Sequence, residues 1–399
     1  MAPQLPMKAA KHLVGRDTDV KENAPEILLI ARRLIGLEFW LAFKDLKKRL
    51  WRGLLMAVAV LPGTLCAQSQ SSLEEPSQRF RAIQNIFDPL SKPAELINDT
   101  ARLTLLICLV IFIIVGGLLL YAVIRYRRRG PEDDATEPSQ VYGSAAIELA
   151  WTIPPILIVI VLVLVTARTV GEVQNPQFPK DPLQLRIIGH RFWWELQYPA
   201  YGVTAANEIH VPVSYLPSTP RPVQMLLDSA DVAHGWWVPQ LNGKLWVVPN
   251  HRNIMWIQPT VLGIYPGNCT VLCGDQHANM LIRVTVESPE DFEKWIAGQK
   301  APAVADPTVE DGRKEFIENS CGTCHRIAGT SAANGVFGPD LTHFMSRQTL
   351  GSGVADNNDE NLRSWLRDPQ VLKPGCLMPN MKLDDKEVDL IFAYLKTLK

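Results

Sequence analysis

The chain contains 399 residues, with 40 basic and 41 acidic side chains and a net charge of −1 at pH 7. This length favours two or three domains with enough apolar material for buried cores. The balanced charge argues against nucleic-acid binding, which requires Lys and Arg side chains clustered on one face. The 7 cysteines are too few for a disulfide-based scaffold in a chain of this length. We therefore expect a multidomain protein whose cysteines have individual roles.

The first apolar stretch, Gly53–Leu65, follows a basic cluster that ends at Arg52. A basic region, a short apolar run and a small-residue site around Cys66 are typical of a signal peptide. Signal peptides begin at the N-terminus, so the preceding residues imply either a start codon assigned too far upstream or a non-cleaved anchor. We favour the first explanation. We expect residues 1–67 to be an N-terminal extension with a signal peptide and residues 68–100 to be a periplasmic segment.

Two long apolar runs follow, Leu103–Ile124 and Ala145–Ala167. As a helix the first is about 33 Å long, which matches the hydrocarbon core of a bilayer. Buried helices of a large soluble protein are the alternative, but two such runs joined by a short polar linker favour a transmembrane hairpin over residues 101–169. The linker opens with arginines at positions 125 and 127–129. The positive-inside rule therefore places it in the cytoplasm and everything after Ala167 outside.

The region from Asp181 to about Ser288 consists of short alternating runs rich in Val, Ile, Trp and Tyr. Such runs, broken by Pro and Gly, are typical of strands and predict an antiparallel sandwich or barrel. We expect strands at Leu185–Tyr198, Glu208–Ser214, Pro222–Asp228, Lys244–Val248, Asn253–Gln258 and Leu281–Val286. The sequence thus predicts an all-β domain at residues 170–290.

Residue types that bind metals gather near the end of this region. The candidates are Cys269, Cys273, His277 and Met280, with His234 far upstream. Thiolate, imidazole and thioether groups select copper over hard cations. Two thiolates this close in sequence can bridge two metal ions, which leaves one imidazole for each copper. A disulfide between the cysteines is the alternative in an oxidising compartment, but it leaves the other spacings unexplained. Zinc is disfavoured because Met is a poor zinc ligand.

A second redox motif lies beyond a polar, Ala- and Pro-rich segment at 291–310, which we expect to be a linker. The sequence Cys321-Gly-Thr-Cys324-His325 has the spacing of c-type heme attachment. Its two thiols can bond both vinyl groups of one porphyrin, and the adjacent imidazole can reach the iron. Half of a zinc site or a redox dithiol is the alternative. No second cysteine pair and no βαβ pattern accompany the motif, which disfavours both.

The copper-type segment resembles the dinuclear copper (CuA) loop of subunit II of heme–copper cytochrome c oxidases. The similarity also covers Asp231–Pro239, Gly189–Pro199, the two apolar runs and Glu148–Pro154. It implies a cupredoxin-like Greek-key sandwich with two copper ions bridged by both cysteines. The implied copper ligands are His234, Cys269, the carbonyl of Val271, Cys273, His277 and, as a weak ligand, Met280.

Two positions depart from the family pattern. Val271 stands where members usually have a glutamate whose side chain helps to bind magnesium at the subunit I interface. The copper site keeps its carbonyl ligand, whereas the magnesium site loses a carboxylate. Phe192 stands where the family has a tryptophan through which electrons arrive. Trp193 and Trp194 follow and can keep an aromatic route, but for at least two of these three residues we favour ordinary strand packing.

Glu148 aligns with the family's glutamate at the mouth of a proton pathway into subunit I. Intramembrane acids are commonly functional, and a side chain that snorkels to the interface is the alternative.

Residues 311–399 resemble a class I cytochrome c, an all-α domain. The similarity covers Gly338–Leu341, Trp365–Leu366 and an expected C-terminal helix at Asp384–Leu398. The implied heme c residues are the covalent anchors Cys321 and Cys324, the axial ligands His325 and Met378, and Pro339, whose carbonyl accepts the imidazole N–H. Met381 is the alternative to Met378. We expect no metal at His190, His210, His251 or His343. We expect Cys108 to be a small apolar filler inside the first span and Cys376 to be a loop residue near the heme edge.

Both centres have full ligand sets, and the sequence shows no nucleophile or general base in a pocket, so we expect no catalytic residue in this chain. The resemblance implies subunit II of a terminal respiratory oxidase in the bacterial inner membrane. A periplasmic donor, such as a cytochrome c or a quinol:acceptor complex, would reduce heme c, which passes electrons to CuA and then to subunit I. Subunit I, which carries heme and CuB, would reduce O2 and pump protons, with subunit III as a further partner.

This assignment makes the chain the electron-accepting part of a translocase-class oxidoreductase. The corresponding subunit of a CuA-containing nitric oxide reductase is the alternative. A membrane-tethered metal carrier is a third possibility, but a carrier needs labile, exposed ligands.

Overall fold

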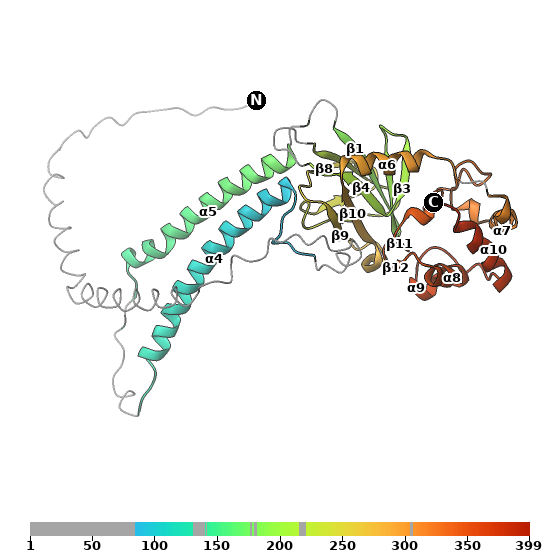
Figure 1. Cartoon of the computed structure of the whole chain (residues 1–399). Helices are drawn as coiled ribbons and strands as arrows, with labels where there is room; N and C mark the ends of the chain where they lie inside the picture. The colour runs from blue at the N-terminus through green and yellow to red at the C-terminus, as the bar shows by residue number, and fades with distance from the viewer. Residues whose placement is uncertain are drawn as a thin grey trace, which may run out of the picture. The chain divides into compact units, whose positions relative to one another are not determined.

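The computed structural model describes residues 84–130, 140, 142–175, 178, 182–214, 221–303 and 306–399. The predicted extension and signal peptide at 1–67 lie outside the described residues. The described part contains a helical hairpin, a β-sandwich and a C-terminal helical domain (Figure 1). These are the three fold classes that the sequence predicts.

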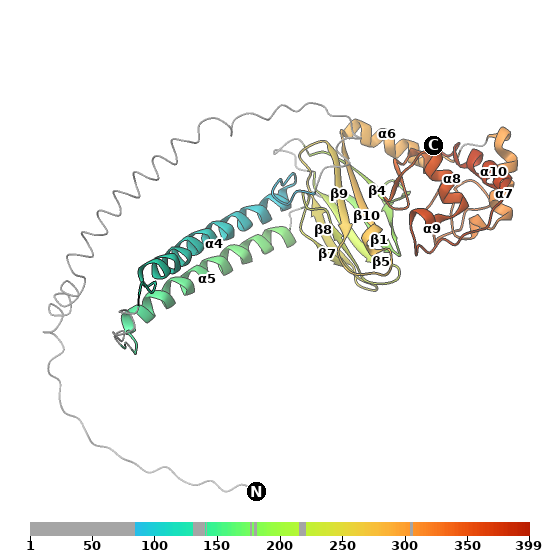
Figure 2. The same cartoon turned by 90° about the horizontal axis from the view of Figure 1, so that it is seen from below.

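Two long helices, α4 (Lys92–Arg125) and α5 (Ala145–Gln174), contain the two apolar runs. They lie side by side in Figures 1 and 2, and the hydroxyl oxygens of Thr100 and Thr169 are 2.7 Å apart. Most of their apolar side chains are exposed, as expected for surfaces that face lipid. At 34 residues, α4 is about 51 Å long, so its polar first turns extend beyond the bilayer core.

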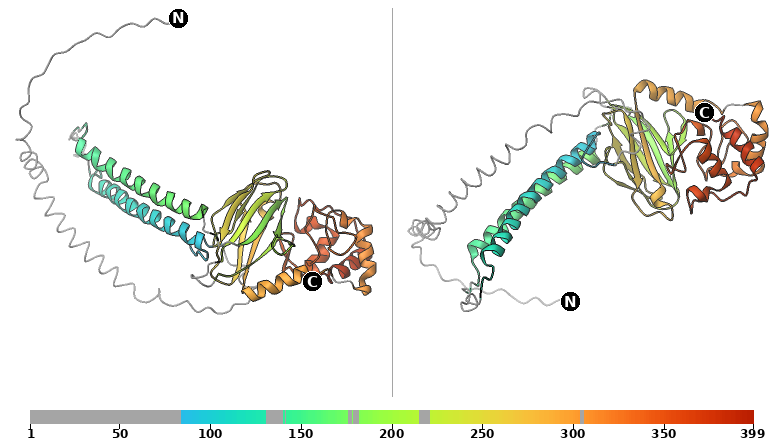
Figure 3. Two further views of the ribbon diagram at one scale, coloured as in Figure 1. Left: turned by 90° about the horizontal axis from the view of Figure 1, so that it is seen from above. Right: turned by 60° about the horizontal axis from the view of Figure 1, so that its bottom comes forward.

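The sandwich consists of two five-stranded sheets, in the orders β3-β2-β1-β5-β8 and β4-β10-β9-β6-β7. The views in Figure 3 show these strands, which follow the helical hairpin and precede the C-terminal helices along the chain. The strands are β1 (Leu183–His190), β2 (Trp193–Tyr198), β3 (Val203–Ala206), β4 (Glu208–Pro212), β5 (Val223–Ser229), β6 (His234–Trp237), β7 (Leu245–Val247), β8 (Asn253–Ile257), β9 (Gly263–Cys269) and β10 (Leu281–Glu287). Their inward side chains form one core, in which Trp194, Trp236 and Tyr198 are the largest fully buried groups.

The predicted sandwich is confirmed, but the expectation of purely antiparallel sheets is wrong for two strand pairs. β1 pairs with β5, and β4 pairs with β10, in parallel. Parallel neighbours need a crossover connection, and between the members of each pair the chain passes through the other sheet. Local alternation of residues shows which face of a strand is buried and does not encode this long-range pairing.

The expected strand Leu185–Tyr198 is a hairpin of β1 and β2, with Arg191 and Phe192 at the turn. The pattern predicts one strand because neither turn residue, Arg191 or Phe192, is one of the Gly, Pro, Asn or Asp residues that mark a turn. Strands β3, β6 and β9 were not expected. In β9, Gly263, Pro266 and Gly267 interrupt the strand signal.

The segment 291–310, expected as a linker, begins inside helix α6 (Pro289–Lys300). The Ser288 hydroxyl caps this helix by accepting from the backbone N–H of Asp291. Phe292 and Ile296, one turn apart, are buried in the sandwich core. The polar composition favours a linker, whereas these two side chains supply the apolar face that fixes the helix on the sheet.

The C-terminal domain is built mainly from α7 (Glu310–Glu318), α8 (Asp359–Arg367), α9 (Pro369–Leu372) and α10 (Asp385–Leu395). A short hairpin, β11 (Thr349–Leu350) and β12 (Ala355–Asp356), and the 3₁₀ turns η3 (Pro307–Val309), η4 (Cys321–Thr323) and η5 (Phe344–Ser346) complete it. Asp384 and Glu387 form a capping box that begins α10, the helix expected at Asp384–Leu398. Its buried face includes Val388 and Ile391, which pack with Ile327 in the domain core.

Candidate metal centres

The copper-type residues come together at one end of the sandwich. Cys269 ends β9, and His234 begins β6, the neighbouring antiparallel strand. The loop after Cys269 returns through a 3₁₀ turn, η2 (His277–Asn279), into β10, and Met280 immediately precedes β10. Pairing of β6 with β9 therefore brings His234 to a loop that follows it by more than thirty residues.

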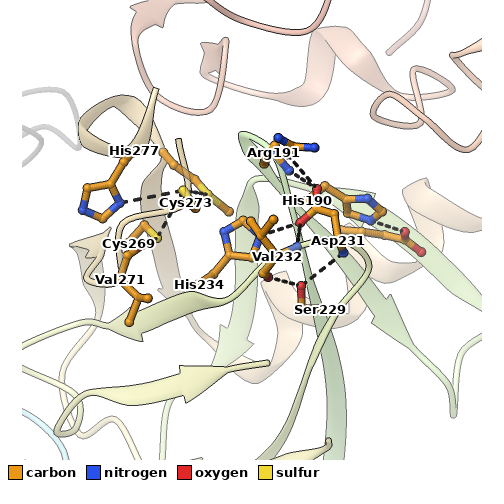
Figure 4. A network of polar contacts seen from close by, with 12 residues as sticks. His190, Arg191, Ser229, Asp231, Val232, His234, Cys269, Val271, Cys273 and His277 are labelled. Carbon is orange, nitrogen blue, oxygen red and sulfur yellow. Dashed lines mark hydrogen bonds and ion pairs between the residues drawn. The ribbon is translucent and has the colours of Figure 1, made fainter. Parts of the chain in front are cut away.

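Cys273 lies at the centre of the group. Its sulfur is 3.9 Å from Cys269 Sγ and 3.8 Å from His277 Nδ1 (Figure 4). It is also 3.9 Å from Met280 Sδ. The carbonyl oxygen of Val271 lies 3.3 Å from Cys269 Sγ. Ligand atoms of His234, Cys269 and Cys273 all lie within 4.8 Å of one another. The structure thus brings together all six predicted copper ligands, and both cysteines are free thiols rather than a disulfide.

The chemistry of this group fits copper. The pKa of Cys269 is lowered, chiefly because Cys273 donates a hydrogen bond to its sulfur, and the pKa of Cys273 is raised by the same contact. A metal-free pair therefore holds one thiolate, because two thiolates at this separation repel each other. Metal ligation uses the thiolate form, so two thiolates require nearby cations. The soft, buried donor set is suited to copper.

His234 is fully buried, and its two ring nitrogens differ. Nε2 lies 2.8 Å from Asp231 Oδ1 (Figure 4). Nδ1 is buried and has no hydrogen-bond partner among the described residues. Burial acts to lower the pKa of His234, but hydrogen bonding to Asp231 and the nearby Cys269 raise it overall. An imidazole held through one nitrogen, with the other free, is the usual arrangement of a metal ligand.

Asp231 is a site residue that the sequence analysis missed. Its carboxylate also accepts backbone hydrogen bonds from Arg191 and Val232, at 2.7 and 2.6 Å. Burial acts to raise the pKa of Asp231, but these bonds and the bond with His234 hold it below its ordinary value. The one sequence signal was its place three residues before His234, within a segment assigned only by resemblance.

We predict that Asp231→Asn weakens copper binding about tenfold to a hundredfold, the usual effect of removing a partner that orients a ligand. The amide still fits beside His234, but it lacks the negative charge that makes the imidazole a stronger ligand. The measurement is the chelator concentration that removes half of the copper. Asp228→Asn is the matched control, because Asp228 pairs with Arg186 and Arg252 instead. Equal copper retention in both variants would contradict the role of Asp231.

The three predicted aromatic-route residues are all buried, and they have different neighbours. Trp193 stacks on His190, with ring centroids 4.3 Å apart. Trp194 packs edge-on against Trp236 in the core and lies 5.8 Å from the His234 ring. A Cβ placed on Gly274 would lie 3.0 Å from the ring of Phe192, so Phe192 packs directly against the copper loop. The electron route itself stays a prediction.

The heme-attachment motif lies on η4 and the residues that follow it. His325 Nδ1 donates to the carbonyl of Pro339 at 2.9 Å, the contact that the resemblance implies, which leaves Nε2 for iron. Burial lowers the pKa of His325, so the imidazole is neutral near pH 7. Burial also raises the pKa of Cys321 to about 11. Gly338 is needed beside the ring, because a Cβ there would lie 2.5 Å from His325 Cε1.

Met378 is held by two side chains that the sequence analysis did not assign a role. Trp365 Nε1 lies 3.2 Å from Met378 Sδ, and Gln370 Nε2 donates to the Met378 carbonyl at 3.0 Å. Exposed apolar side chains flank both candidate ligands: Val336 and Phe337 near His325, and Leu377 beside Met378. Exposed apolar side chains beside the candidate ligands are suited to contact with a porphyrin ring.

Three histidines to which no metal was assigned have hydrogen-bond partners within the protein. His190 pairs with Glu195, His210 with Glu287, and His343 with the backbone carbonyls of Lys399 and Ala301. Among the described residues, His234, Cys269 and Cys273 are the group with metal-binding geometry. Glu148 lies exposed in the first turn of α5, and its proton role stays a prediction.

Comparison with known proteins supports the organisation of the chain. Family models for the "Cytochrome C oxidase subunit II, transmembrane domain", the "Cytochrome C oxidase subunit II, periplasmic domain" and "Cytochrome c" match residues 82–168, 215–287 and 309–399. The cytochrome c oxidase subunit 2 of Alkalihalophilus pseudofirmus is 33% identical over 320 residues, which cover 78% of this chain and 90% of that protein. The subunit 2 of Bacillus subtilis is 31% identical over 331 residues, with the same two shares of 78% and 90%.

The matched families agree with the structure in all three parts of the chain. The transmembrane model covers most of the two long apolar helices, the periplasmic model matches the sandwich, and the cytochrome c model matches the C-terminal helical domain. The chain belongs to the cytochrome c oxidase subunit II family, as a membrane-anchored member with two spans and a C-terminal cytochrome c domain.

Proposed function

We propose that this chain is the subunit through which electrons enter a terminal respiratory oxidase. Electrons would pass from a periplasmic donor through heme c to a dinuclear CuA centre, and on to heme in subunit I. The observation that supports the proposal is the clustering of the candidate copper ligands at one end of the sandwich, together with a heme-attachment motif whose His325 is oriented by the Pro339 carbonyl in the C-terminal domain. We propose electron transfer rather than substrate chemistry, because both donor sets consist of side chains that bind redox-active groups.

Six residues would hold the copper pair. Cys269 and Cys273 would bridge the ions, His234 and His277 would each bind one, and Met280 and the Val271 carbonyl would be weak ligands. When bound, the pair supplies a one-electron acceptor whose charge is shared by both ions. The protein's contribution is to keep the ligands in place: four of them are buried, and the Asp231 carboxylate fixes the His234 ring. A rigid, dry site needs little rearrangement when its charge changes.

The heme would be attached through Cys321 and Cys324, with His325 and Met378 as axial ligands. When bound, it supplies a one-electron carrier at the surface of the C-terminal domain. The Pro339 carbonyl orients His325, and Trp365 with Gln370 holds the Met378 loop. The C-terminal domain, below called the heme domain, is fused to the sandwich, below called the copper domain. This fusion replaces a diffusing carrier by a tethered one at high effective concentration.

The remaining roles depend on partner subunits. Subunit I would reduce O2 and pump protons, which makes the assembled complex a translocase of the bacterial inner membrane, with subunit III as a further component. Glu148, at the start of α5, would lie at the entrance of a proton pathway into subunit I. Phe192, beside the copper loop, would lie on the electron route. Val271 has no carboxylate, so a magnesium ion at the subunit interface would need its ligands from elsewhere.

The test is metal analysis and spectroscopy of the purified full chain. We expect two copper ions for each iron, a c-type α-band after reduction, and a mixed-valence copper signal in the EPR spectrum. A single mononuclear copper, or a Cys269–Cys273 disulfide in the metal-loaded protein, would overturn the oxidase assignment. Rapid loss of copper to a chelator would instead favour a metal carrier.

A further inference from the structure

A buried lysine joins the heme domain to the copper loop. Lys373 is 3% exposed, and its ammonium donates to three backbone carbonyls. These are Phe192 O at 2.9 Å, Asn279 O at 2.9 Å and Gly351 O at 2.7 Å. The first two belong to the copper domain, and Asn279 immediately precedes Met280. The third belongs to the heme domain itself.

These contacts use every donor of the lysine side chain. An ammonium group has three N–H donors, and each has one carbonyl within hydrogen-bond distance. Lys373 lies five residues before Met378, the candidate iron ligand. The same loop of the heme domain therefore also donates hydrogen bonds to the copper domain, one of them to the residue before Met280. A buried charge adds little stability compared with a well-packed apolar side chain, but it is costly to leave unpaired. In another docked arrangement the Lys373 ammonium would lose its hydrogen bonds to the copper domain.

A carboxylate of the copper domain makes the reciprocal contact. Glu208 on β4 is 4% exposed and accepts from the backbone N–H of Gln348, and from the N–H and hydroxyl of Thr349 at 2.8 and 2.7 Å. Arg283, its register partner on β10, donates to the Gln348 side chain. A lysine from the heme domain and a glutamate from the copper domain thus each hold the backbone of the opposite domain.

Close backbone packing lies between these two polar contacts. The N–H of Leu281 donates to Ser352 O at 3.2 Å, and the Ser352 hydroxyl donates to Leu281 O at 3.3 Å. Gln276 in the copper loop donates to the carbonyl of Pro374. A Cβ on Gly375 would lie 3.2 Å from Asp275 Cβ, so the two loops touch. The segment 275–281 therefore contacts the heme domain through Asp275, Gln276, Asn279 and Leu281.

We propose that Lys373 and Glu208 are positioning residues that hold the heme domain in one docked arrangement on the copper loop. In this arrangement the Met378 loop and the Met280 loop stay in contact, which sets the path for electron transfer within the chain. The significance for electron transfer rests on the proposed function. The docking itself is a property of the polypeptide and is tested separately.

The first test compares Lys373→Met with Lys386→Met in the full, metal-loaded chain. Both variants lose one positive charge, but Lys386 is exposed on α10. After photoreduction of the heme, we expect electron transfer to copper to slow at least about tenfold in Lys373→Met, because an unpaired interface contact lowers the docked fraction. The control should match wild type. Heme and copper content, reduction potentials and optical spectra should be unchanged in both, which separates positioning from folding.

The second test measures the docking of the two domains by amide hydrogen exchange, which does not depend on electron transfer. The amides of Leu281, Gln348 and Thr349 bond across the interface, so their hydrogen exchange should accelerate at least about tenfold in Lys373→Met. Glu208→Gln should have the same effect through the opposite contact. Enhancement of copper spin relaxation by ferric iron should also weaken in both variants.

The outcomes distinguish the two proposals. Wild-type chain without heme-to-copper transfer, but with protected interface amides, would refute the relay and leave the docking intact. Rapid transfer and unchanged amide protection in both Lys373→Met and Glu208→Gln would overturn the positioning role and leave the relay intact. Loss of heme or copper in a variant would assign that residue to folding and likewise overturn its positioning role.

Discussion

Replacing Cys273 by serine should reduce the copper content from two ions per chain to one or none and stop electron transfer through the sandwich domain. Cys273 Sγ lies within 4 Å of a sulfur of Cys269, a nitrogen of His277 and a sulfur of Met280, so it is in contact with three of the other candidate ligands. A serine hydroxyl does not deprotonate near pH 7 and is a harder donor than a thiolate, so it cannot bridge two copper ions.

The measurement is copper analysis together with the EPR spectrum. We expect the mixed-valence signal to disappear and any remaining copper to give a mononuclear signal. Cys108→Ser is the matched control, because Cys108 lies exposed on α4 and takes no part in the group. Retention of two copper ions with an unchanged spectrum in Cys273→Ser would refute the bridging role. The same loss in Cys108→Ser would show that the effect comes from thiol removal in general.

The sequence predicts the candidate ligands well because most of them are close in the chain. Cys269, Cys273 and His277 belong to one loop, and Cys321 with His325 belongs to one turn. Residue types and short spacings are sufficient to identify such sites. His234 is different, since only the pairing of β6 with β9 brings it to the loop, and neither strand was expected from the sequence pattern.

Residues that hold the ligands in place were harder to predict. Asp231 and Trp365 each contact a ligand side chain, but an aspartate or tryptophan at such a position has many ordinary roles. Lys373 and Glu208 act across a domain interface, and hydrophobic periodicity describes one element at a time. Because Lys is rarely buried, a lysine in the sequence is expected to be exposed, and the burial of Lys373 could not be predicted. These contacts depend on how two folded domains meet.

Parallel strand pairing was missed for a related physical reason. The burial of β1 and β5 follows from their alternating apolar residues, which the sequence shows. Their direction relative to each other depends on the path of the chain through β4 in the opposite sheet. Pattern analysis therefore predicts the layers of the sandwich and leaves their connections open.

The identity of the second heme ligand gives the other large prediction. Met378→Leu should lower the reduction potential of heme c by on the order of 0.1 V, because a methionine ligand raises the potential and axial ligands tune heme over about 0.8 V. The heme should stay attached through Cys321 and Cys324. Leucine has a similar volume and cannot bind iron, so the charge-transfer band of methionine-ligated ferric heme should disappear.

Met381→Leu is the matched control, since Met381 lies three residues further along the same loop and is partly buried like Met378. The structure favours Met378, because Trp365 contacts its sulfur and Gln370 holds its backbone, which together fix the side chain in one position. Redox titration and the ferric absorption spectrum of both variants decide between them. Loss of the band in Met381→Leu alone would assign the ligand to Met381. Loss in neither would exclude methionine ligation from this loop, and electron delivery to the copper loop would then start from a heme of lower potential.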